Sequence, residues 1–266
     1  MIERNYLQGA PNFRDLGGME TTDGRRIKPH RLLRCGHLRD ITEEDKQRLT
    51  EEFQLKTVVD LRTSGEIARK PDAVLPGVEY IHCPIFEQKA EGVTRETVVE
   101  EDRVASALTM AHHMEGQAFE RMTGLYGVFF EEHGIEMYRK FFEIVLHQEE
   151  GAVLWHCTMG KDRCGTAAAL VEIALGVPRE AVMADYLYTN ERILPITEEV
   201  IALARAVTDD EVLFEQMRIM DSVHETFLNA AFQKAVGLSG SLEKFIEEQL
   251  GMTPEKIERL RDMYLE

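Results

Sequence analysis

Short apolar runs, separated by longer segments of helical periodicity, organise this chain. Three of these runs are rich in β-branched and aromatic residues, at residues 57–61, 80–85 and 152–156. Runs of this kind are typical of strands buried on both faces of a parallel sheet. A fourth run, Leu32-Leu33-Arg34, predicts another short strand, and Asp23-Gly24 within residues 17–27 is a hairpin signal.

Helical patterns fill the remainder of the chain. Residues 135–147 place an aromatic face on one side, and an Ala- and Leu-rich segment over residues 165–175 stops at Gly176. Further helices are predicted from Thr42 to about residue 53, from the capping box at residues 208–211 to about residue 236, and from Thr253-Pro254 onward. Alternating strands and helices predict one α/β domain spanning residues 1–266, with a short, mostly parallel central sheet and an N-terminal hairpin.

The segment at residues 86–134 interrupts this alternation. It is too long for a plain loop, and its composition predicts two helices, at residues 98–114 and 119–132. One interpretation is an ordinary helical insertion that completes the core. The other is a lid over a site, because insertions at strand ends often cover one. Composition alone favours the first interpretation.

Composition sets limits on what the protein does. The chain has 266 residues, 44% of them hydrophobic, and a formal net charge of −17. The acidic balance argues against non-specific binding to nucleic acid or to an anionic membrane, although a local cluster of amides and cations can still bind an anion. The N-terminal residues lack the apolar stretch of a signal peptide, no apolar run approaches membrane-spanning length, and the four cysteines do not suggest a disulfide scaffold. We expect a cytoplasmic protein without stable membrane insertion.

One motif carries chemistry, and it reads His-Cys-Thr-Met-Gly-Lys-Asp-Arg over residues 156–163. It follows a predicted buried strand and opens a predicted helix. A loop in that position turns unpaired N–H groups toward one centre, and the helix dipole adds to their field, which makes an anion cradle. Arg163 can close the cradle by binding two phosphate oxygens. His156 is expected to order the loop through hydrogen bonds and not to act as an acid or base.

Cys157 lies at the near end of this cradle. The field that binds phosphate also favours a thiolate, so we expect the pKa of Cys157 to lie well below the free value of about 8.5. The thiolate would attack phosphorus in line and form a cysteinyl-phosphate that water later hydrolyses. No metal or other cofactor is needed, because the loop amides, Arg163 and Lys161 stabilise the charge. The alternative for Cys157 is a small buried apolar residue, the usual fate of a free cysteine.

The loop resembles the active-site loop of the cysteine-dependent protein tyrosine phosphatases. Its His-Cys-x-x-Gly-Lys-Asp-Arg form is similar to a bacterial branch described as acting on phosphotyrosine, phosphoserine/threonine and phosphoinositides. Four further segments resemble that branch: residues 12–18, 33–36, 59–63 with Glu66, and 185–190. The resemblance implies a protein-tyrosine-phosphatase-like fold and a phosphorylated protein or phosphoinositide substrate. Residues 86–134 match least, and some members carry a helical lid there.

The resemblance also assigns a general acid. Many tyrosine phosphatases use an aspartate on a Trp-Pro-Asp loop, but the single tryptophan here, Trp155, precedes the motif. The resemblance implies that Asp162 takes the role; the alternative is that Asp162 caps the following helix. Asp60 is the runner-up acid, because it ends a predicted parallel strand. We expect Arg62 and Glu66 to form a structural ion pair.

The remaining loop positions leave alternatives open. The backbone of residues Thr158, Met159, Gly160, Lys161 and Cys164 is expected to bind phosphate. Lys161 is either a solvated surface lysine or a ligand for an additional phosphate. Cys164 stands where the family usually has Thr or Ser, which would weaken a hydrogen bond to the thiolate and slow the second step. A reversible disulfide between Cys157 and Cys164 is a further hypothesis.

Cys35 and Cys83 are expected to be plain core residues. Two functions compete with phosphate monoester hydrolysis: a rhodanese-like or arsenate-reducing thiol enzyme, and a phosphate-binding module without turnover.

Overall fold

The computed structural model describes residues 7–86 and 103–266. Its centre is a five-stranded sheet with the strand order β1-β2-β5-β3-β4. The strands are β1 (Arg14–Asp15), β2 (Leu32–Cys35), β3 (Leu55–Asp60), β4 (Glu79–His82) and β5 (Ala152–His156). Only β1 runs antiparallel to its neighbour; the pairs β2–β5, β5–β3 and β3–β4 are parallel. The predicted short, mostly parallel sheet is confirmed.

The register brings three strand ends together. Cys35 at the end of β2 and Asp60 at the end of β3 both pair with His156, the last residue of β5. The chain therefore leaves β5 at the centre of the carboxyl edge of the sheet, between two neighbours. In open α/β sheets this edge is where ligands bind.

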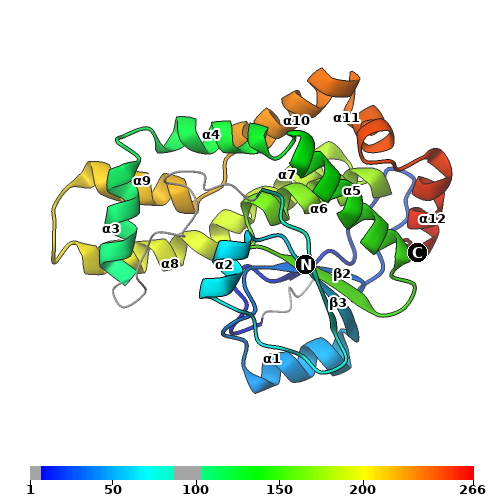
Figure 1. Cartoon of the computed structure of the whole chain (residues 1–266), viewed down its shortest axis with the longest axis horizontal. Coiled ribbons are helices and arrows are strands. Elements are labelled where there is room, and N and C mark those ends of the chain that lie inside the picture. The colour runs from blue at the N-terminus through cyan, green and yellow to red at the C-terminus, as the bar shows by residue number, and fades with distance from the viewer. Residues whose placement is uncertain (1–6, 87–102) are drawn as a thin grey trace.

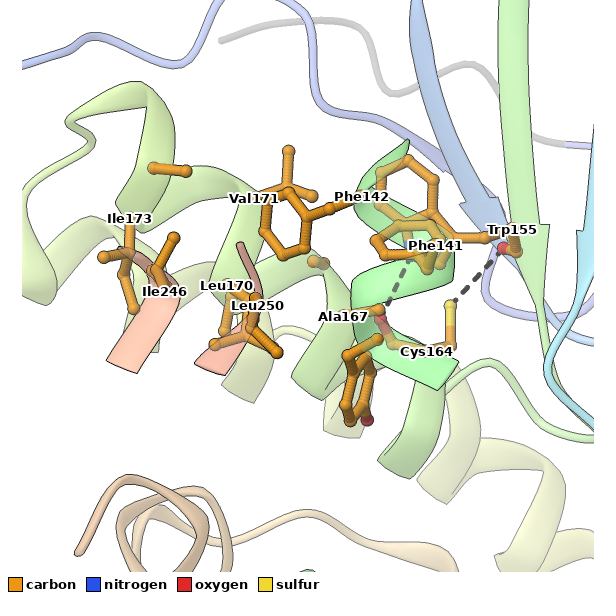
Figure 2. Close-up of a cluster of buried hydrophobic side chains, with 14 of the residues drawn as sticks. Phe141, Phe142, Trp155, Cys164, Ala167, Leu170, Val171, Ile173, Ile246 and Leu250 are labelled. Atoms are coloured by element: carbon orange, nitrogen blue, oxygen red, sulfur yellow. Dashed lines mark hydrogen bonds between the residues drawn. The ribbon is translucent and has the colours of Figure 1, made fainter. Parts of the chain in front are cut away.

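Helices cover both faces of the sheet (Figure 1). Side chains alternate along β5, so that Val153 and Trp155 point to one face and Leu154 to the other. The larger core lies on the first face, and Figure 2 shows Trp155 packed there against Phe141 of α5 (Glu132–His147), beside α6 (Asp162–Leu175). The second face is covered by α1 (Glu43–Gln47), by the π-helical turn Arg48–Glu52 and by the N-terminal segment.

The remaining helices complete the chain. They are α2 (Ser64–Arg69), α3 (Arg103–His113), α4 (Ala118–Val128), α7 (Arg179–Leu187), α8 (Thr189–Ala204), α9 (Glu211–Asp221), α10 (Glu225–Ser239), α11 (Leu242–Lys244) with a π-helical turn at Phe245–Gln249, and α12 (Pro254–Tyr264). Helices α3, α8 and α9 extend away from the sheet on the left of Figure 1 and share a small core of their own. No helix among the described residues is long and apolar enough to cross a membrane.

Several predicted elements are confirmed with their end signals. Thr42 caps α1 through a capping box, α6 ends at Gly176 in the left-handed conformation, and Thr253 caps α12 with Pro254 in its first turn. The hairpin is present as the antiparallel bridge between Glu20 and Arg26.

The long helix predicted from residue 208 to about residue 236 is wrong. It is two helices, α9 and α10, and Asp210 rather than Thr208 caps the first. Asn190 of α8 accepts from the N–H of Val223 and donates to its carbonyl, so both backbone groups of Val223 bond outside a helix. His224 then caps α10 by accepting from the N–H of Thr226. Tertiary hydrogen bonds therefore break a segment whose local sequence is compatible with one helix.

The described part of the insertion packs in two different places. Residues 87–102 lie outside the described residues, so the start predicted at residue 98 is not placed, and α4 ends at Val128 rather than at residue 132. Tyr126 of α4 and Phe129, which follows the last residue of that helix, are buried in the larger core, which fits the core-completing interpretation. Helix α3 packs against α8 and α9 instead and lines the same cavity as Cys157 and Arg163, and the lid interpretation stays a prediction.

Candidate active site

The loop between β5 and α6 wraps tightly against the end of β2. Gly160 has a φ of 68°, and a Cβ at this position would lie 2.4 Å from the backbone carbon of Cys35. A side chain is therefore excluded both by backbone conformation and by space. Glycine at this position lets the loop turn back and reach the helix that begins at Asp162.

The loop's carbonyl groups are bonded to elements outside the loop. The carbonyl of Gly160 accepts from Asn12 Nδ2 at 2.8 Å and from Arg34 Nη2 at 3.0 Å, and the carbonyl of Thr158 accepts from the N–H of His37 at 3.1 Å. Within the described part of the chain, the backbone N–H groups of residues 158–161 donate no hydrogen bond. Carbonyls fixed outward and donors left unpaired are what an anion cradle requires.

Arg163 is held by Glu66 at the edge of the cradle. Its Nη1 and Nη2 donate to Glu66 Oε2 and Oε1 at 2.6 and 2.8 Å, and Thr158 Oγ1 donates to Glu66 Oε1 at 2.5 Å. Both residues of the pair are 7% exposed. Burial opposes ionisation of Glu66, but Arg163 outweighs burial and holds the pKa of Glu66 well below its ordinary value. Glu66 raises the pKa of Arg163 against the effect of burial.

The prediction of an ion pair between Arg62 and Glu66 is wrong. Arg62 Nη2 instead bonds to Asp60 Oδ2 at 2.7 Å and to Asp72 Oδ2 at 2.5 Å. Glu66 lies in the first turn of α2, where its carboxylate accepts from the N–H of Thr63 in a capping box, and this places the carboxylate toward the loop. Sequence spacing identified the charged residues but not the partner of each.

A buried charged cluster supports the start of the loop. His156 Nε2 lies 3.2 Å from Asp72 Oδ2 and 3.8 Å from Asp60 Oδ2, and His156 is fully buried. Burial alone would lower the pKa of His156, but the charges of Asp60 and Asp72 raise it above its ordinary value. His156 Nδ1 also lies 3.3 Å from the carbonyl of Cys157, in line with the predicted ordering role.

The same cluster could be taken for a metal site. Ligand atoms of Asp60, Asp72 and His156 lie within 4.8 Å of one another. The guanidinium of Arg62 already contacts both carboxylates, and it supplies the positive charge that a metal ion would bring. The donor set therefore does not fit a metal. Asp60 is committed to Arg62 in this cluster, which argues against its role as the runner-up acid.

Asp162 lies at the opening of the cradle. It occupies the first turn of α6, and no side chain caps that helix, so the capping alternative is not what the structure shows. Its Oδ1 accepts from the hydroxyl of Tyr126 at 2.8 Å, and Lys161 Nζ lies 2.9 Å from its Oδ2. Tyr126 in turn shares a 2.6 Å hydrogen bond with the hydroxyl of Tyr186. Lys161 is 5% exposed, which excludes a solvated surface lysine.

Cys164 is a buried thiol with a raised pKa that hydrogen-bonds to backbone. Its Sγ donates to the carbonyl of Trp155, and Trp155 Nε1 donates to the carbonyl of Cys164, as Figure 2 shows. Burial raises the pKa of Cys164 to about 12. Cys35, Cys83, Cys157 and Cys164 are all free and buried, and Cys35 and Cys83 lie in the core as predicted.

A cavity of about 880 Å³ opens above the loop. Six of the loop residues named from the sequence line it: Cys157, Thr158, Met159, Lys161, Asp162 and Arg163. Neither Asp60 nor His156 is among the described residues that line the cavity. Tyr126, Asp72 and Asn12, which contact residues of the loop, were not predicted from the sequence as parts of the site. Only Asn12 carried a signal, within the segment at residues 12–18.

The chain is similar to known proteins along its whole length. A sequence profile described as the tyrosine phosphatase family matches residues 5–266. A Cupriavidus necator protein, provisionally named a tyrosine-protein phosphatase, is 29% identical over 256 residues, which is 96% of this chain and 85% of that protein. The triple specificity protein phosphatase PtpB of Mycobacterium tuberculosis is 28% identical over 278 residues, covering 97% and 98% of the two chains. The match to the solved structure of Pseudomonas aeruginosa TpbA covers 72% of this chain and 89% of that one, at 16% identity and with a TM-score of 0.29.

Proposed function

The chain belongs to the tyrosine phosphatase family, and we propose that it hydrolyses phosphate monoesters through a covalent intermediate on Cys157. The observation that carries this proposal is the cradle. Cys157 begins a loop whose amides at residues 158–161 are unpaired among the described residues, and Arg163 faces the same cavity, held by Glu66. We propose that residues 1–266 act as one phosphatase domain.

In the first step the thiolate of Cys157 attacks phosphorus. The sulfur–phosphorus bond forms as the bond from phosphorus to the leaving oxygen breaks, and that oxygen takes a proton from Asp162. Arg163 binds two of the phosphoryl oxygens, and the amides of residues 158–164 stabilise the charge on the phosphoryl group. Tyr126 and Lys161 fix the carboxyl of Asp162 at the mouth of the cradle.

In the second step water attacks the phosphorus of the cysteinyl-phosphate. Asp162, now ionised, accepts a proton from the water, the sulfur–phosphorus bond breaks, and the thiolate and phosphate are released. Lys161 stabilises the carboxylate that results from the first step. In the proposed mechanism, residues of this chain supply the nucleophile of the first step, the acid and base, and the groups that stabilise charge.

The substrates we propose are phosphotyrosine in proteins first, with phosphoserine/threonine and phosphoinositides as further candidates. The matched family and the triple specificity named for the mycobacterial relative support this range. The buried Lys161 adds a cation beside the cradle that suits a substrate with more than one phosphate.

A substrate panel tests the proposal. Phosphate release from p-nitrophenyl phosphate, phosphotyrosine, phosphoserine and a phosphoinositide is measured with EDTA present, for the wild type and for Cys157→Ser and Asp162→Asn. Cys157→Ser should abolish turnover, whereas Asp162→Asn should impair poor leaving groups more than good ones. Equal loss for both leaving groups would remove Asp162 from the acid role. Thiocyanate formation, arsenate turnover or binding without release would favour one of the rival functions.

A further inference from the structure

The cavity over the catalytic loop has two different sides. One side is polar and comes from α2 and the loop after β2, with Arg69 and His37 among its residues. The other side comes from α3, α4, α8 and α9 and is mostly apolar, with Arg103, Ser106, Thr197 and Asp221 as its polar members. Six of the chain's twelve methionines line the cavity, and they are Met110, Met114, Met122, Met159, Met217 and Met220. The proposed chemistry requires none of their side chains.

The apolar side is the open edge of a hydrophobic core. Helices α3, α8 and α9 enclose a small core in which Val200 and Met217 are buried and against which Met220 packs. Val200, Met217 and Met220 also line the cavity, as do the half-buried Met110 and Ile196. The small core therefore reaches the wall of the cavity through Val200, Met217 and Met220, although Thr197 and Asp221 of the same helices, which hydrogen-bond to each other at 3.0 Å, also line it.

The composition of this side points to a flexible apolar occupant. Methionine is unbranched and polarisable, so a methionine wall adapts to chains of differing shape and makes no hydrogen bond that a ligand must satisfy. A cavity of about 880 Å³ lies at the upper end of the range for small-molecule sites, larger than a phosphate and one aromatic ring need.

We propose that the helices α3, α8 and α9 form a subsite for an unbranched hydrocarbon chain carried by the leaving group of the substrate. Phosphate monoesters whose alcohol bears a flexible apolar chain that enters the protein are then substrates in addition to the phosphorylated residues proposed above. This inference rests on the proposed phosphatase function, because the subsite is defined relative to the phosphate on Cys157.

A series of n-alkyl phosphates from butyl to decyl tests the subsite, assayed by phosphate release below the micelle concentration. Leaving-group acidity is constant across the series, so kcat/KM reports the binding of the chain. Complete transfer of one methylene corresponds to about fourfold. We expect about twofold for each methylene, and thus roughly 60-fold for the six methylenes between butyl and decyl phosphate.

Two pairs of variants locate the effect. Ile196→Gln on α8 and Met220→Gln on α9 place an amide in the subsite, and each should lower the decyl-to-butyl ratio by about fivefold. Their matched controls are Leu203→Gln and Val212→Gln, on the same two helices but 64% and 60% exposed and outside the described lining. The controls should keep the wild-type ratio. Inhibition of p-nitrophenyl phosphate turnover by butyl- and decylphosphonate compares the binding of the two alkyl chains without hydrolysis of an alkyl phosphate.

The outcomes separate this inference from the function on which it rests. A decyl-to-butyl ratio within about threefold of one, with p-nitrophenyl phosphate still hydrolysed, overturns the subsite and leaves the phosphatase function intact. A steep ratio that both subsite variants and both controls preserve also overturns it. Failure of the wild type to release phosphate from p-nitrophenyl phosphate refutes the proposed function itself.

Discussion

The ion pair between Glu66 and Arg163 predicts how much stability the protein loses when Glu66 loses its charge. The two side chains share hydrogen bonds of 2.6 and 2.8 Å, and each residue is 7% exposed. Glu66→Gln keeps the shape of the side chain but leaves the charge of Arg163 without its partner. Removing one member of a buried ion pair costs about 3 kcal/mol, which for a chain of this size corresponds to roughly 6–12 °C in melting temperature.

The loss should depend on pH, with a definite sign. Folding lowers the pKa of Glu66, so its ionisation stabilises the wild type above the ordinary glutamate pKa of about 4.3. That contribution disappears as the pH falls through the folded-state pKa, and the variant never has it. The difference in unfolding free energy between wild type and Glu66→Gln should therefore be largest above about pH 5 and shrink toward acid.

Activity gives a readout that a purely structural role would not change. Without Glu66 the guanidinium is no longer oriented, so kcat/KM should fall by roughly 10- to 100-fold, which corresponds to about 1.4–2.7 kcal/mol of lost transition-state stabilisation. Phosphate or tungstate should stabilise the variant more than the wild type, because the oxyanion supplies the missing negative charge. Thermal unfolding at pH 4–8 measures the pH dependence of the stability difference, and its repetition with the oxyanion measures the stabilisation by phosphate or tungstate. Equal stability at every pH together with unchanged kcat/KM would refute the reasoning.

Three further predictions follow from single contacts. Gly160→Ala should abolish turnover and lower the melting temperature measurably in a thermal scan, since its Cβ would meet backbone 2.4 Å away. Tyr126→Phe removes a donor to Asp162, so the loss in kcat should be about tenfold for alkyl phosphates and smaller for p-nitrophenyl phosphate. Asp72→Asn should remove a pH-dependent stabilisation that His156 gives the wild type. Because folding raises the pKa of His156, that stabilisation is present below the ordinary histidine pKa of about 6.5 and is lost as the pH rises through the folded-state pKa. Denaturant titrations of the wild type and the variant across this pH range measure it.

Matched variants control these three. Gly124 of α4 has nothing within 4 Å of an added Cβ, and alanine is the better helix former, so Gly124→Ala should keep turnover and should not lower the melting temperature. Tyr186→Phe keeps the bond between Tyr126 and Asp162 and should affect kcat less than Tyr126→Phe. Equal effects of the two tyrosine variants would assign both to packing, and a pH profile unchanged by Asp72→Asn would remove His156 from the linkage.

The elements that the sequence predicted well are those set by local physics. The apolar runs became strands, Thr42 and Thr253 became caps, and Gly176 ended a helix, because each signal acts within a few residues. The order of the site residues along the loop was also predictable, since a strand followed directly by a helix fixes where Cys157 and Arg163 lie.

What the sequence could not predict depends on partners distant in the chain. Glu66 binds Arg163, 97 residues away, while Arg62 turns to Asp72. Charge type names the candidates for such pairs, but only the fold decides which of them meet. The break between α9 and α10 has the same origin, because Asn190 supplies its hydrogen bonds. The hydroxyl of Tyr126 reaches Asp162 from the insertion, the segment with the weakest sequence signal.

The most direct test of the central claim is to trap the covalent intermediate. The enzyme is mixed with excess p-nitrophenyl phosphate and quenched in acid within the first turnovers, and its intact mass and peptides are measured. We predict one phosphoryl group per chain, mapped to Cys157, present in the wild type and absent in Cys157→Ser, which should also release no phosphate. Phosphate release with no adduct on Cys157, or turnover that survives Cys157→Ser, would contradict the account.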